Sequence, residues 1–449
     1  MYGRSPHILM AAPQAVPWTA RVTSARVRTT IVSTSLPNAD SGSGASIALA
    51  LIASALRERG HDVSLCPLVY PEYVTPDGAG HERQLEVATS LGYEVVPVLS
   101  EAWRQRPVDR SVSARIRRAW RPEPEELYPQ LRDARSVRES VARLAPEAVF
   151  VYGFSALAAS AELRVPRFAA TSDPPHESLR GRTLRRWREE RRPLRILRDA
   201  VSLQAKLRAY PRLDEQLLQD CEAVGAFGRH HAESLRRAGI ACGYYRTPIA
   251  DPGPPGPPPA NERPRLLLIG HLRGTATLDG LRVFRAMLPH LERELGAGGF
   301  EARVVGGYDA PPELRPLLEH PSMRFVGFVD EVDEEFRAAD VLLVPVSIRL
   351  GVRVRVLTGF SHGSCIVTHE ANAYGIPELE HGRNALLGSS AAGLASQVVR
   401  ALREPELRGR LRVGARETYE RCFTPSVAGA ALGETLERIA GARLREAAR

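Results

Sequence analysis

A proline-rich segment constrains the fold of this chain more than any other sequence feature. Residues 251–264 read DPGPPGPPPANERP, and seven of them are proline. Proline fixes φ and has no amide hydrogen, so this segment can enter neither a helix interior nor the middle of a sheet. The 449-residue chain is also too long for one ordinary hydrophobic core. We therefore expect two domains, residues 27–250 and 265–425, that are hinged at the segment and face each other across a cleft.

The first domain reads as alternating strands and helices. A β-rich stretch at residues 27–34 leads through a loop with Gly42, Ser43 and Gly44 into a helix at residues 45–59. A Rossmann-like domain begins in this way, and the glycines would let a ligand in the cleft approach the backbone closely. The alternative is a plain tight turn, since the spacing is not G-x-G-x-x-G. Further strands are expected at residues 63–67, 94–99, 148–152, 167–171 and 223–227.

Polar residues follow the strand expected at residues 167–171. Ligands of open α/β sheets bind beyond the carboxyl ends of the strands. Asp173 and His176 are therefore the candidate catalytic residues that the first domain contributes to the cleft. The alternative is that Asp173 caps a turn and His176 is solvated.

The second domain contains a strand-loop-helix unit that suits a phosphate group. Apolar residues 341–346 predict a buried parallel strand, and a glycine loop then opens into a helix with Arg353 and Arg355 near its first turn. Helix N-terminal amides and guanidinium groups together favour an anion. A strand at residues 364–368 and a short helix from Gly375 follow. The alternative is an ordinary αβ unit whose arginines are solvated.

The motifs of this unit resemble those of a known family. Gly351, Arg353 and Arg355 match a loop that the family writes G-x-R-x-K-x-L-E-A, and residues 375–387 match G-I-P-E-L-x-x-G-x-N-x-L-L. Residues 265–423 thereby resemble the donor-binding half of GT-B glycosyltransferases of the retaining, sugar-nucleotide-dependent type (group 1, family 4-like). The resemblance is weak before this stretch.

The resemblance implies two Rossmann-like domains facing a central cleft, with a C-terminal helix in residues 426–449 that crosses back to the first domain. It also implies sugar transfer from a nucleotide-diphosphate sugar to a hydroxyl-bearing acceptor, with retention of anomeric configuration. The acceptor class stays open between a polysaccharide, a lipid-linked glycan and a small-molecule glycoside. Arg353 and Arg355 would act in catalysis by stabilising the departing diphosphate. The donor site would further include Gly270, His271, Arg273, Thr277 and Gly351.

Two carboxylates of the family are missing from this chain. The family places one acid near Leu350, for the donor sugar, and another at Thr358, for the nucleotide ribose. A threonine hydroxyl can bond one ribose hydroxyl, but it cannot make the charge-assisted contact of a carboxylate with two of them. The polar groups that could serve the donor instead lie in the loop after the next strand, at His369, Glu370, Asn372 and Tyr374.

The missing acids keep a second function open, that of a non-catalytic GT-B partner or scaffold protein in a polysaccharide assembly system. A sugar-nucleotide epimerase would need acid–base carboxylates in the cleft, which the sequence does not indicate. We expect no metal ion, because no carboxylate cluster in the sequence suits a divalent cation. We also expect no cofactor apart from the nucleotide-diphosphate sugar as co-substrate.

The net charge of +9 does not predict nucleic-acid binding. Lys206 is the only lysine among 61 basic residues, a skew that is typical of a GC-rich coding sequence. The sequence shows no basic stripe interleaved with aromatic residues. Residues 180–201 predict a basic amphipathic helix with Trp187, which could contact an anionic membrane. The alternative is a helix with its apolar face on the core and its arginines in water.

The N-terminal residues and the cysteines indicate in which compartment of the cell the protein is found. Residues 1–26 show no periodic pattern and are either a disordered extension or a mis-assigned start. The five cysteines lie far apart, and no apolar run approaches the roughly 20 residues that cross a bilayer. We therefore expect a cytoplasmic protein with reduced thiols, and the inner face of a membrane is the alternative location.

Overall fold

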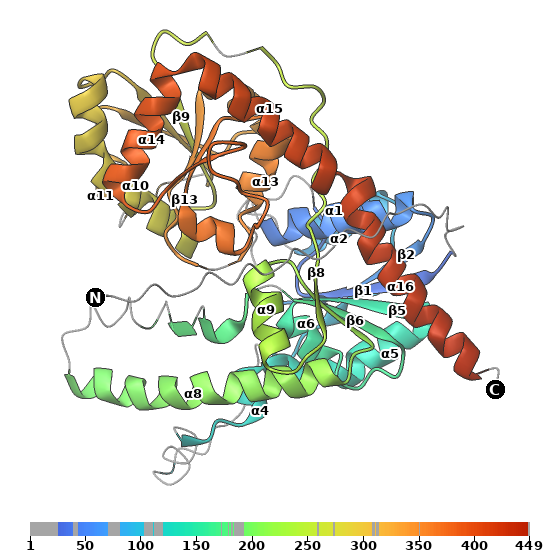
Figure 1. Ribbon diagram of the computed structural model, residues 1–449. Coiled ribbons are helices and arrows are strands. Elements are labelled where there is room, and N and C mark those ends of the chain that lie inside the picture. Colours follow the sequence, from blue (N-terminus) through green and yellow to red (C-terminus); the bar gives the residue numbers. More distant parts are fainter. Residues whose placement is uncertain are drawn as a thin grey trace, which may run out of the picture.

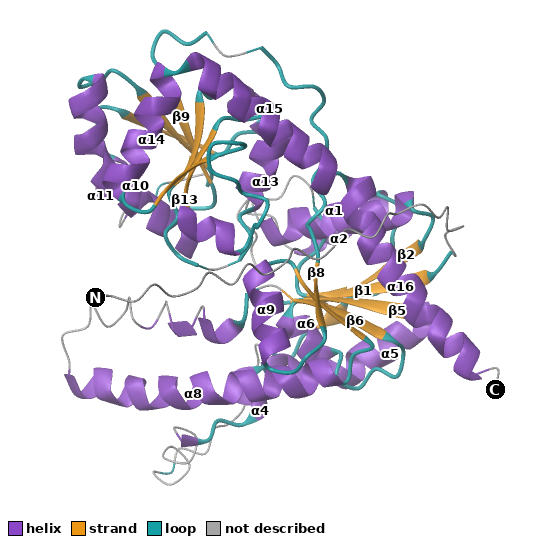
Figure 2. Ribbon diagram, viewed as in Figure 1, coloured by secondary structure: helices purple, strands orange, loops and turns teal. Residues whose placement is uncertain are grey.

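The computed structural model describes residues 26–38, 44–70, 81–102, 111, 120–171, 173–177, 179–180, 183, 193–257, 260–272, 274–307, 310, 314–349 and 351–447. These residues form two α/β domains (Figure 1), each built around one parallel sheet with helices on both faces (Figure 2). The prediction of two Rossmann-like domains is confirmed. Among the described helices, none combines the length and the apolar character that crossing a membrane requires.

The first domain is organised by an eight-stranded sheet in the order β3-β2-β1-β5-β6-β7-β8, with β4 paired to β2. Every pairing in it is parallel. Helices cover both faces of the central strands, so these strands consist of continuous apolar runs such as AVFVY in β5. The strands are β1 (Arg28–Ser33), β2 (Asp62–Val69), β3 (Glu94–Val95), β4 (Val98–Leu99), β5 (Ala148–Tyr152), β6 (Arg167–Thr171), β7 (Ala223–Ala226) and β8 (Cys242–Tyr244).

Two features of the first domain differ from the simple sequence pattern. The strand expected at residues 94–99 is divided into β3 and β4, because Pro97 lies between them and cannot donate a ladder hydrogen bond. Of the basic helix expected at residues 180–201, residues 181–182 and 184–192 lie outside the described residues. The main helices are α1 (Gly44–Glu58), α2 (His81–Ser90), α4 (Pro124–Leu127), α5 (Ala134–Leu144), α6 (Phe154–Ala159), α8 (Pro193–Gln219) and α9 (Arg229–Arg237).

The second domain has a six-stranded parallel sheet in the order β11-β10-β9-β12-β13-β14. In chain order this is 3-2-1-4-5-6, the order of a doubly wound sheet, and its switch point lies between β9 and β12. The strands are β9 (Arg265–Ile269), β10 (Glu301–Val305), β11 (Met323–Gly327), β12 (Val341–Val344), β13 (Ile366–His369) and β14 (Leu386–Gly388). The helices are α10 (Thr275–Leu295), α11 (Arg315–Leu318), α12 (Val332–Ala338), α13 (Val354–Ser361), the 3-10 turn η3 (Glu370–Tyr374), α14 (Ala391–Arg403) and α15 (Pro405–Cys422).

The short helix of the second domain begins earlier than the sequence predicted. It is η3, which ends just before Gly375, whereas the expected helix would have started there. The ring nitrogen Nδ1 of His369 accepts a hydrogen bond from the amide of Ala371 and caps the turn. The buried Asn372 amide then ties the turn to the carbonyl of Val346 and to the hydroxyl of Thr368. The capping histidine therefore sets the start of the turn.

The chain crosses between the domains twice, and the two crossings lie side by side. The first follows β8, and the second joins α15 to α16 (Pro425–Ala447), which packs on the first domain (Figure 1). The amide of Ile249 in the first crossing donates to the carbonyl of Phe423 in the second, at 2.8 Å. Leu432 and Leu436 of α16 join the core around Ile31 of β1. The predicted return of the C-terminal helix to the first domain is confirmed.

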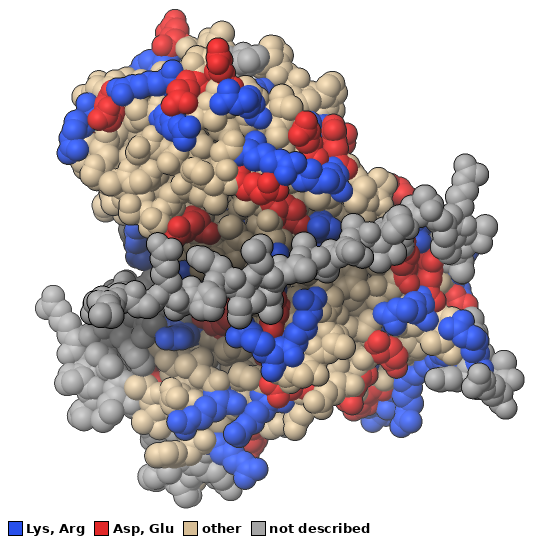
Figure 3. Space-filling model, in the orientation of Figure 1, with Lys and Arg blue, Asp and Glu red and all other residues tan. Residues whose placement is uncertain are grey.

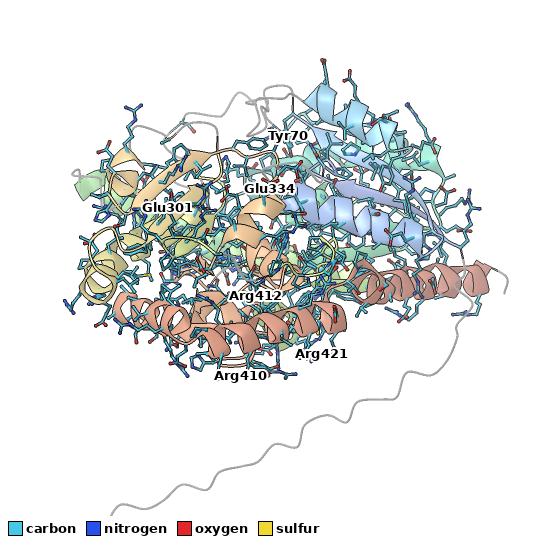
Figure 4. All side chains as sticks on the ribbon, turned by 90° about the horizontal axis from the view of Figure 1, so that it is seen from above. Tyr70, Glu301, Glu334, Arg410, Arg412 and Arg421 are labelled. Carbon is cyan, nitrogen blue, oxygen red and sulfur yellow. The ribbon has the colours of Figure 1, made fainter. Side chains whose placement is uncertain are left out.

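The proline-rich segment lies along the second domain and is held there by α15. Arg412 donates to the carbonyl of Gly256 at 3.0 Å, and Arg416 binds Asp251 through two hydrogen bonds. Figure 4 shows Arg412 on the inner side of α15, whereas Arg410 and Arg421 lie on its exposed outer side. The described part of this segment thus packs on one domain, and the interdomain crossing lies before it, near Ile249.

Candidate active site

A cavity of about 1320 Å³ lies between the two domains and is lined by both. The face shown in Figure 3 is hollowed between two lobes, and on this face Lys and Arg are interspersed with Asp and Glu. The cavity meets the carboxyl ends of β9 and β10, which is where open α/β sheets bind ligands. Its volume is sufficient for a molecule larger than a typical drug-sized ligand, whose pockets reach about 1000 Å³.

Glycines at the strand ends make the floor of the cavity. Gly270 follows β9, and Gly306 and Gly307 follow β10; all three have positive φ and line the cavity. A Cβ on Gly306 would collide with the carbonyl oxygen of Gly270, so the two backbones touch. We expected Gly270 here from the family resemblance but missed the Gly306–Gly307 pair. A Gly-Gly pair directly after an apolar strand was the available signal.

Arg355 lies flat against this floor. Its guanidinium covers Gly270 so closely that a Cβ there would lie 2.5 Å from Nη2. Nη2 also donates to the hydroxyl of Thr277 at 3.2 Å. Burial, and then the neighbouring Arg353 cation, lower the pKa of Arg355 to about 10. Only a glycine at position 270 leaves room for the guanidinium group of Arg355. The two residues, both predicted for the site, are therefore in direct contact.

Arg353 stands beside Arg355 and is the N-cap residue of α13. Its Nη2 donates to the carbonyl of Ile348 at 3.1 Å, while its Nε has no hydrogen-bond partner. Burial lowers the pKa of Arg353, and the carboxylates of Asp173 and Asp279 act in the opposite direction. Neither Arg353 nor Arg355 forms an ion pair with a residue that the structure describes. Two largely buried cations that form no salt bridge with a described residue, beside the free amides of a helix N-terminus, make a site for an anion.

Thr358 lines the cavity one turn further along α13. Its hydroxyl donates to the carbonyl of Val354 at 3.1 Å. Acidic side chains line the cavity at the start of α12, and one of them, Asp333, is held by His362, whose Nε2 lies 3.0 Å from Oδ1 of Asp333. The ring of His362 is fixed in turn by stacking on Phe336 and by the carbonyl of Thr358. A carboxylate therefore stands near Thr358, although the chain lacks one at that position.

Asp173 lies on the wall that the first domain contributes. It follows β6 and lines the cavity, as expected for a residue beyond a strand end. Burial raises the pKa of Asp173, and the neighbouring His231 and Arg353 partly offset this effect. His176 does not line the cavity; it lies behind the wall, with Nδ1 3.8 Å from the buried carboxylate of Asp214. The structure thus brings Asp173 to Arg353 but leaves His176 outside the cavity.

The loop after β13 supports the site from outside the cavity. His369, Glu370, Asn372 and Tyr374 do not line it. His369 and Asn372 hold η3 in place, and the ring of Tyr374 lies under the guanidinium of Arg349, 4.0 Å from its centroid. Glu370 is exposed.

The other predicted residues divide into two groups. Gly44 begins α1 and lines the cavity, and His271 and Thr277 line it from the second domain. Gly42, Ser43 and Arg273 lie outside the described residues. The first loops of both domains thus contribute residues to the lining of the cavity.

The fold defined by these two domains and the crossing helix is the GT-B fold. Residues 263–404, which contain Gly270, Arg353 and Thr358, match the family model described as Glycosyl transferases group 1. The predicted resemblance to this class is confirmed. No curated protein matches the chain by sequence.

Solved structures of the same fold cover nearly the whole chain. Anabaena HepE in complex with UDP and glucose has 14% identity and a TM-score of 0.61, covering 92% of this chain and 99% of its own. Sucrose-phosphate synthase from Thermosynechococcus elongatus has 14% identity and a TM-score of 0.63, covering 93% and 100%. Staphylococcus aureus TarM, in complex with Fondaparinux, alpha-GlcNAc-glycerol and UDP, has 6% identity and a TM-score of 0.61, covering 92% and 99%.

Proposed function

We propose that this protein is a glycosyltransferase that takes its sugar from a nucleoside-diphosphate sugar. The observation that carries the proposal is the pair of largely buried guanidinium groups, Arg353 and Arg355, neither of which forms a salt bridge with a described residue. A diphosphate would supply the missing negative charge and would accept charge-assisted hydrogen bonds from both. Because the HepE and TarM structures are complexes with UDP, a uridine nucleotide is the first donor to test.

The chemistry follows from where charge develops. The bond between the anomeric carbon and the diphosphate oxygen breaks, and a bond to the acceptor hydroxyl oxygen forms. Arg353, Arg355 and the first amides of α13 stabilise the negative charge that grows on the leaving diphosphate. The acceptor hydroxyl loses its proton to a base, either a phosphate oxygen of the leaving group or Asp173, whose burial raises its pKa. Retention of configuration is the outcome that the family resemblance supports.

The ribose contact is the part of the site where this chain differs from its family. Thr358 occupies the position of the family's carboxylate, and Asp333 reaches the same part of the cavity from α12. Oδ1 of Asp333 is held by His362, which leaves Oδ2 oriented and 3.9 Å from Arg337. We infer that Asp333 takes over the contact with the ribose hydroxyls. The ribose contact would then have moved from position 358 in α13 to Asp333 in α12.

A binding experiment tests the proposal. The purified chain should be titrated with UDP, GDP, ADP and dTDP by calorimetry, and then incubated with the matching UDP-sugar and candidate acceptors. The proposal predicts saturable binding of at least one nucleoside diphosphate and release of that diphosphate from its sugar conjugate. Binding of a nucleotide without any turnover would instead support the second candidate, a non-catalytic GT-B scaffold, which the absence of acids at positions 350 and 358 favours.

A further inference from the structure

Three side chains that can ligate a metal converge on the first-domain side of the cleft. They are Glu177, His230 and His231, and one ligand atom of each lies within 4.8 Å of the other two. β6 and β7 are parallel neighbours, with Thr171 in register with Ala226. The segments that follow these strands therefore leave the sheet at the same edge, where Glu177 and the two histidines meet.

Three of the four imidazole nitrogens of this cluster have no hydrogen-bond partner. His231 is only 3% exposed, and neither of its ring nitrogens is paired. Nε2 of His230 is also buried and unpaired. Leaving a buried polar group unsatisfied costs about 1–3 kcal/mol, so several such groups at one place require an explanation.

The distance between the facing groups fits an ion between them. Nε2 of His231 lies 3.5 Å from Oε2 of Glu177, which is long for a hydrogen bond. Two ligands that bind one tetrahedral zinc ion with bonds of about 2.0–2.1 Å lie about 3.3–3.4 Å apart. The two side chains are thus spaced as ligands of a shared ion.

An oxygen atom lies behind each of the two imidazole rings. Nδ1 of His230 lies 3.3 Å from the carbonyl oxygen of Tyr374, which can only accept, so Nδ1 carries the proton and Nε2 keeps its lone pair. Nδ1 of His231 faces Oδ1 of Asp173 at 3.8 Å, on the side of the ring away from Glu177. A carbonyl or a carboxylate behind the ring is the usual arrangement of a histidine that ligates a metal.

We propose that Glu177, His230 and His231 bind one divalent transition-metal ion of the zinc class. Two imidazoles and one carboxylate suit zinc, whereas magnesium and calcium prefer oxygen ligands alone. Three protein ligands leave a fourth position open, and it faces the cleft because His231 lines the cavity and the Glu177 side chain is 38% exposed. The sequence led us to expect no metal, because the three ligands are brought together only by the fold.

The ion would also connect the two domains. Next to the cluster, the amide of Arg229 donates to the carbonyl of Gly375 at 3.2 Å, beside the contact of His230 with Tyr374. Fixing the ring of His230 on a metal therefore fixes a contact to the second domain. This site does not depend on the proposed sugar transfer, since it needs neither Arg353 nor a nucleotide.

Metal binding by the full chain tests the proposal. After treatment with a chelator, the protein should be titrated by calorimetry with zinc chloride and, separately, with magnesium chloride. We expect one zinc ion per chain, a rise in melting temperature with zinc, and no binding of magnesium. Glu177→Gln and His231→Ala should each weaken zinc binding at least about tenfold. His320→Gln is the matched control, because His320 also lies 3.5 Å from a glutamate, Glu292, but has no second imidazole beside it.

Two outcomes would overturn the proposal. One is the absence of stoichiometric zinc binding by the unmodified chain. The other is zinc affinity that stays unchanged in both Glu177→Gln and His231→Ala. If the burial of His231 prevents its variant from folding, His230→Ala and Glu177→Gln decide the question, because both positions are partly exposed. Calorimetry with a nucleotide in the same samples keeps this result separate from that of the proposed function.

Discussion

The carboxylate of Asp173 packs directly against the backbone of Gly351 across the cleft between the domains. A Cβ on Gly351 would lie 2.6 Å from Oδ1 of Asp173, and the φ of this glycine is +61°. The loop that carries Arg353 therefore approaches the first domain as closely as a bare Cα permits. The glycine of the family's loop motif is explained here by an interdomain contact as well as by its backbone conformation.

Replacing Gly351 tests this contact. Gly351→Ala should lower the free energy of unfolding by about 1–2 kcal/mol because of its positive φ. It should also weaken nucleoside-diphosphate binding, since the clash with Asp173 displaces the loop before Arg353. The matched control is Gly382→Ala, where φ is +78° and nothing lies within 4 Å of the added Cβ. Denaturant unfolding measures the stability of both variants, and calorimetry measures their affinity for the nucleotide. Equal affinities in the two variants would contradict the proposed effect of the contact.

Removing one guanidinium tests the diphosphate site. Arg353→Ala should weaken the binding of a nucleoside diphosphate by about 1.5–3 kcal/mol, the contribution of a charged hydrogen bond. The same change should weaken the binding of inorganic pyrophosphate, because the contact is to phosphate oxygens. Arg410→Ala, at an exposed position on the outer side of α15 (Figure 4), should leave both affinities unchanged. Equal affinities in Arg353→Ala and the unmodified chain would remove this site.

Asp333→Asn distinguishes a contact with the ribose from a contact with the phosphates. The amide keeps the shape of the side chain and loses its charge, so it should weaken nucleoside-diphosphate binding by about 1 kcal/mol or more. Pyrophosphate affinity should not fall, since Asp333 is proposed to contact only the sugar hydroxyls. Glu334→Asn, on the same helix but not lining the cavity, provides the control. A parallel loss of pyrophosphate affinity would show that Asp333 acts on the phosphate site instead.

Thr358→Glu returns a carboxylate to the position that the family uses. We expect it to preserve or tighten donor binding, because its charge is compensated by Arg353 and Arg355. In an Asp333→Asn background it should recover the lost affinity, whereas Thr358→Gln, of equal length but uncharged, should recover less. If the pocket has been rebuilt around Thr358, the new acid is buried without partners and donor binding is lost. Circular dichroism would confirm that such a loss is not unfolding.

Asp214 makes stability depend on pH. The carboxylate is buried and accepts a hydrogen bond from the hydroxyl of Tyr128, and burial raises its pKa from 3.8 to about 7. Between these values the folded protein holds a proton that the unfolded chain releases, so the free energy of unfolding falls as the pH rises toward 7. Asp214→Asn should remove this slope, which is at most about 1.4 kcal/mol per pH unit for one proton.

Denaturant unfolding from pH 4 to pH 8 measures the slope. Asp220→Asn, at an exposed position directly after α8, the helix that carries Asp214, should leave the slope unchanged. The assignment to Asp214 is wrong if the profile of Asp214→Asn is as steep as that of the unmodified chain.

The sequence predicted the strands well wherever burial alone sets their pattern. β5 coincides with the apolar run at residues 148–152, because a strand covered on both faces is largely apolar, and β6 coincides with the strand expected at residues 167–171, whose central residues are apolar. The start of η3 was predicted wrongly, since it depends on the capping ring of His369 rather than on periodicity. Local hydrogen bonds of this kind leave little trace in the hydrophobic pattern.

The candidate site was predicted only in part, for a similar reason. Arg353 and Arg355 were found because they belong to one continuous motif. Asp333, Glu177 and the His230–His231 pair were missed, because they meet the site only through the packing of strands that are distant in sequence. The two adjacent histidines directly after β7 were a usable signal, since residues beyond adjacent strand ends share one edge of the sheet.

The hydrogen bond between Ile249 and Phe423 ties the two chain crossings together. Both chain crossings pass through this one place, so neither domain can slide away from the other without breaking the bond or unwinding α16. Opening the cleft would in addition break the hydrogen bond from the amide of Arg229 to the carbonyl of Gly375 and separate Asp173 from Gly351, so the contacts within the cleft, and not the chain crossings alone, hold the two domains in this arrangement.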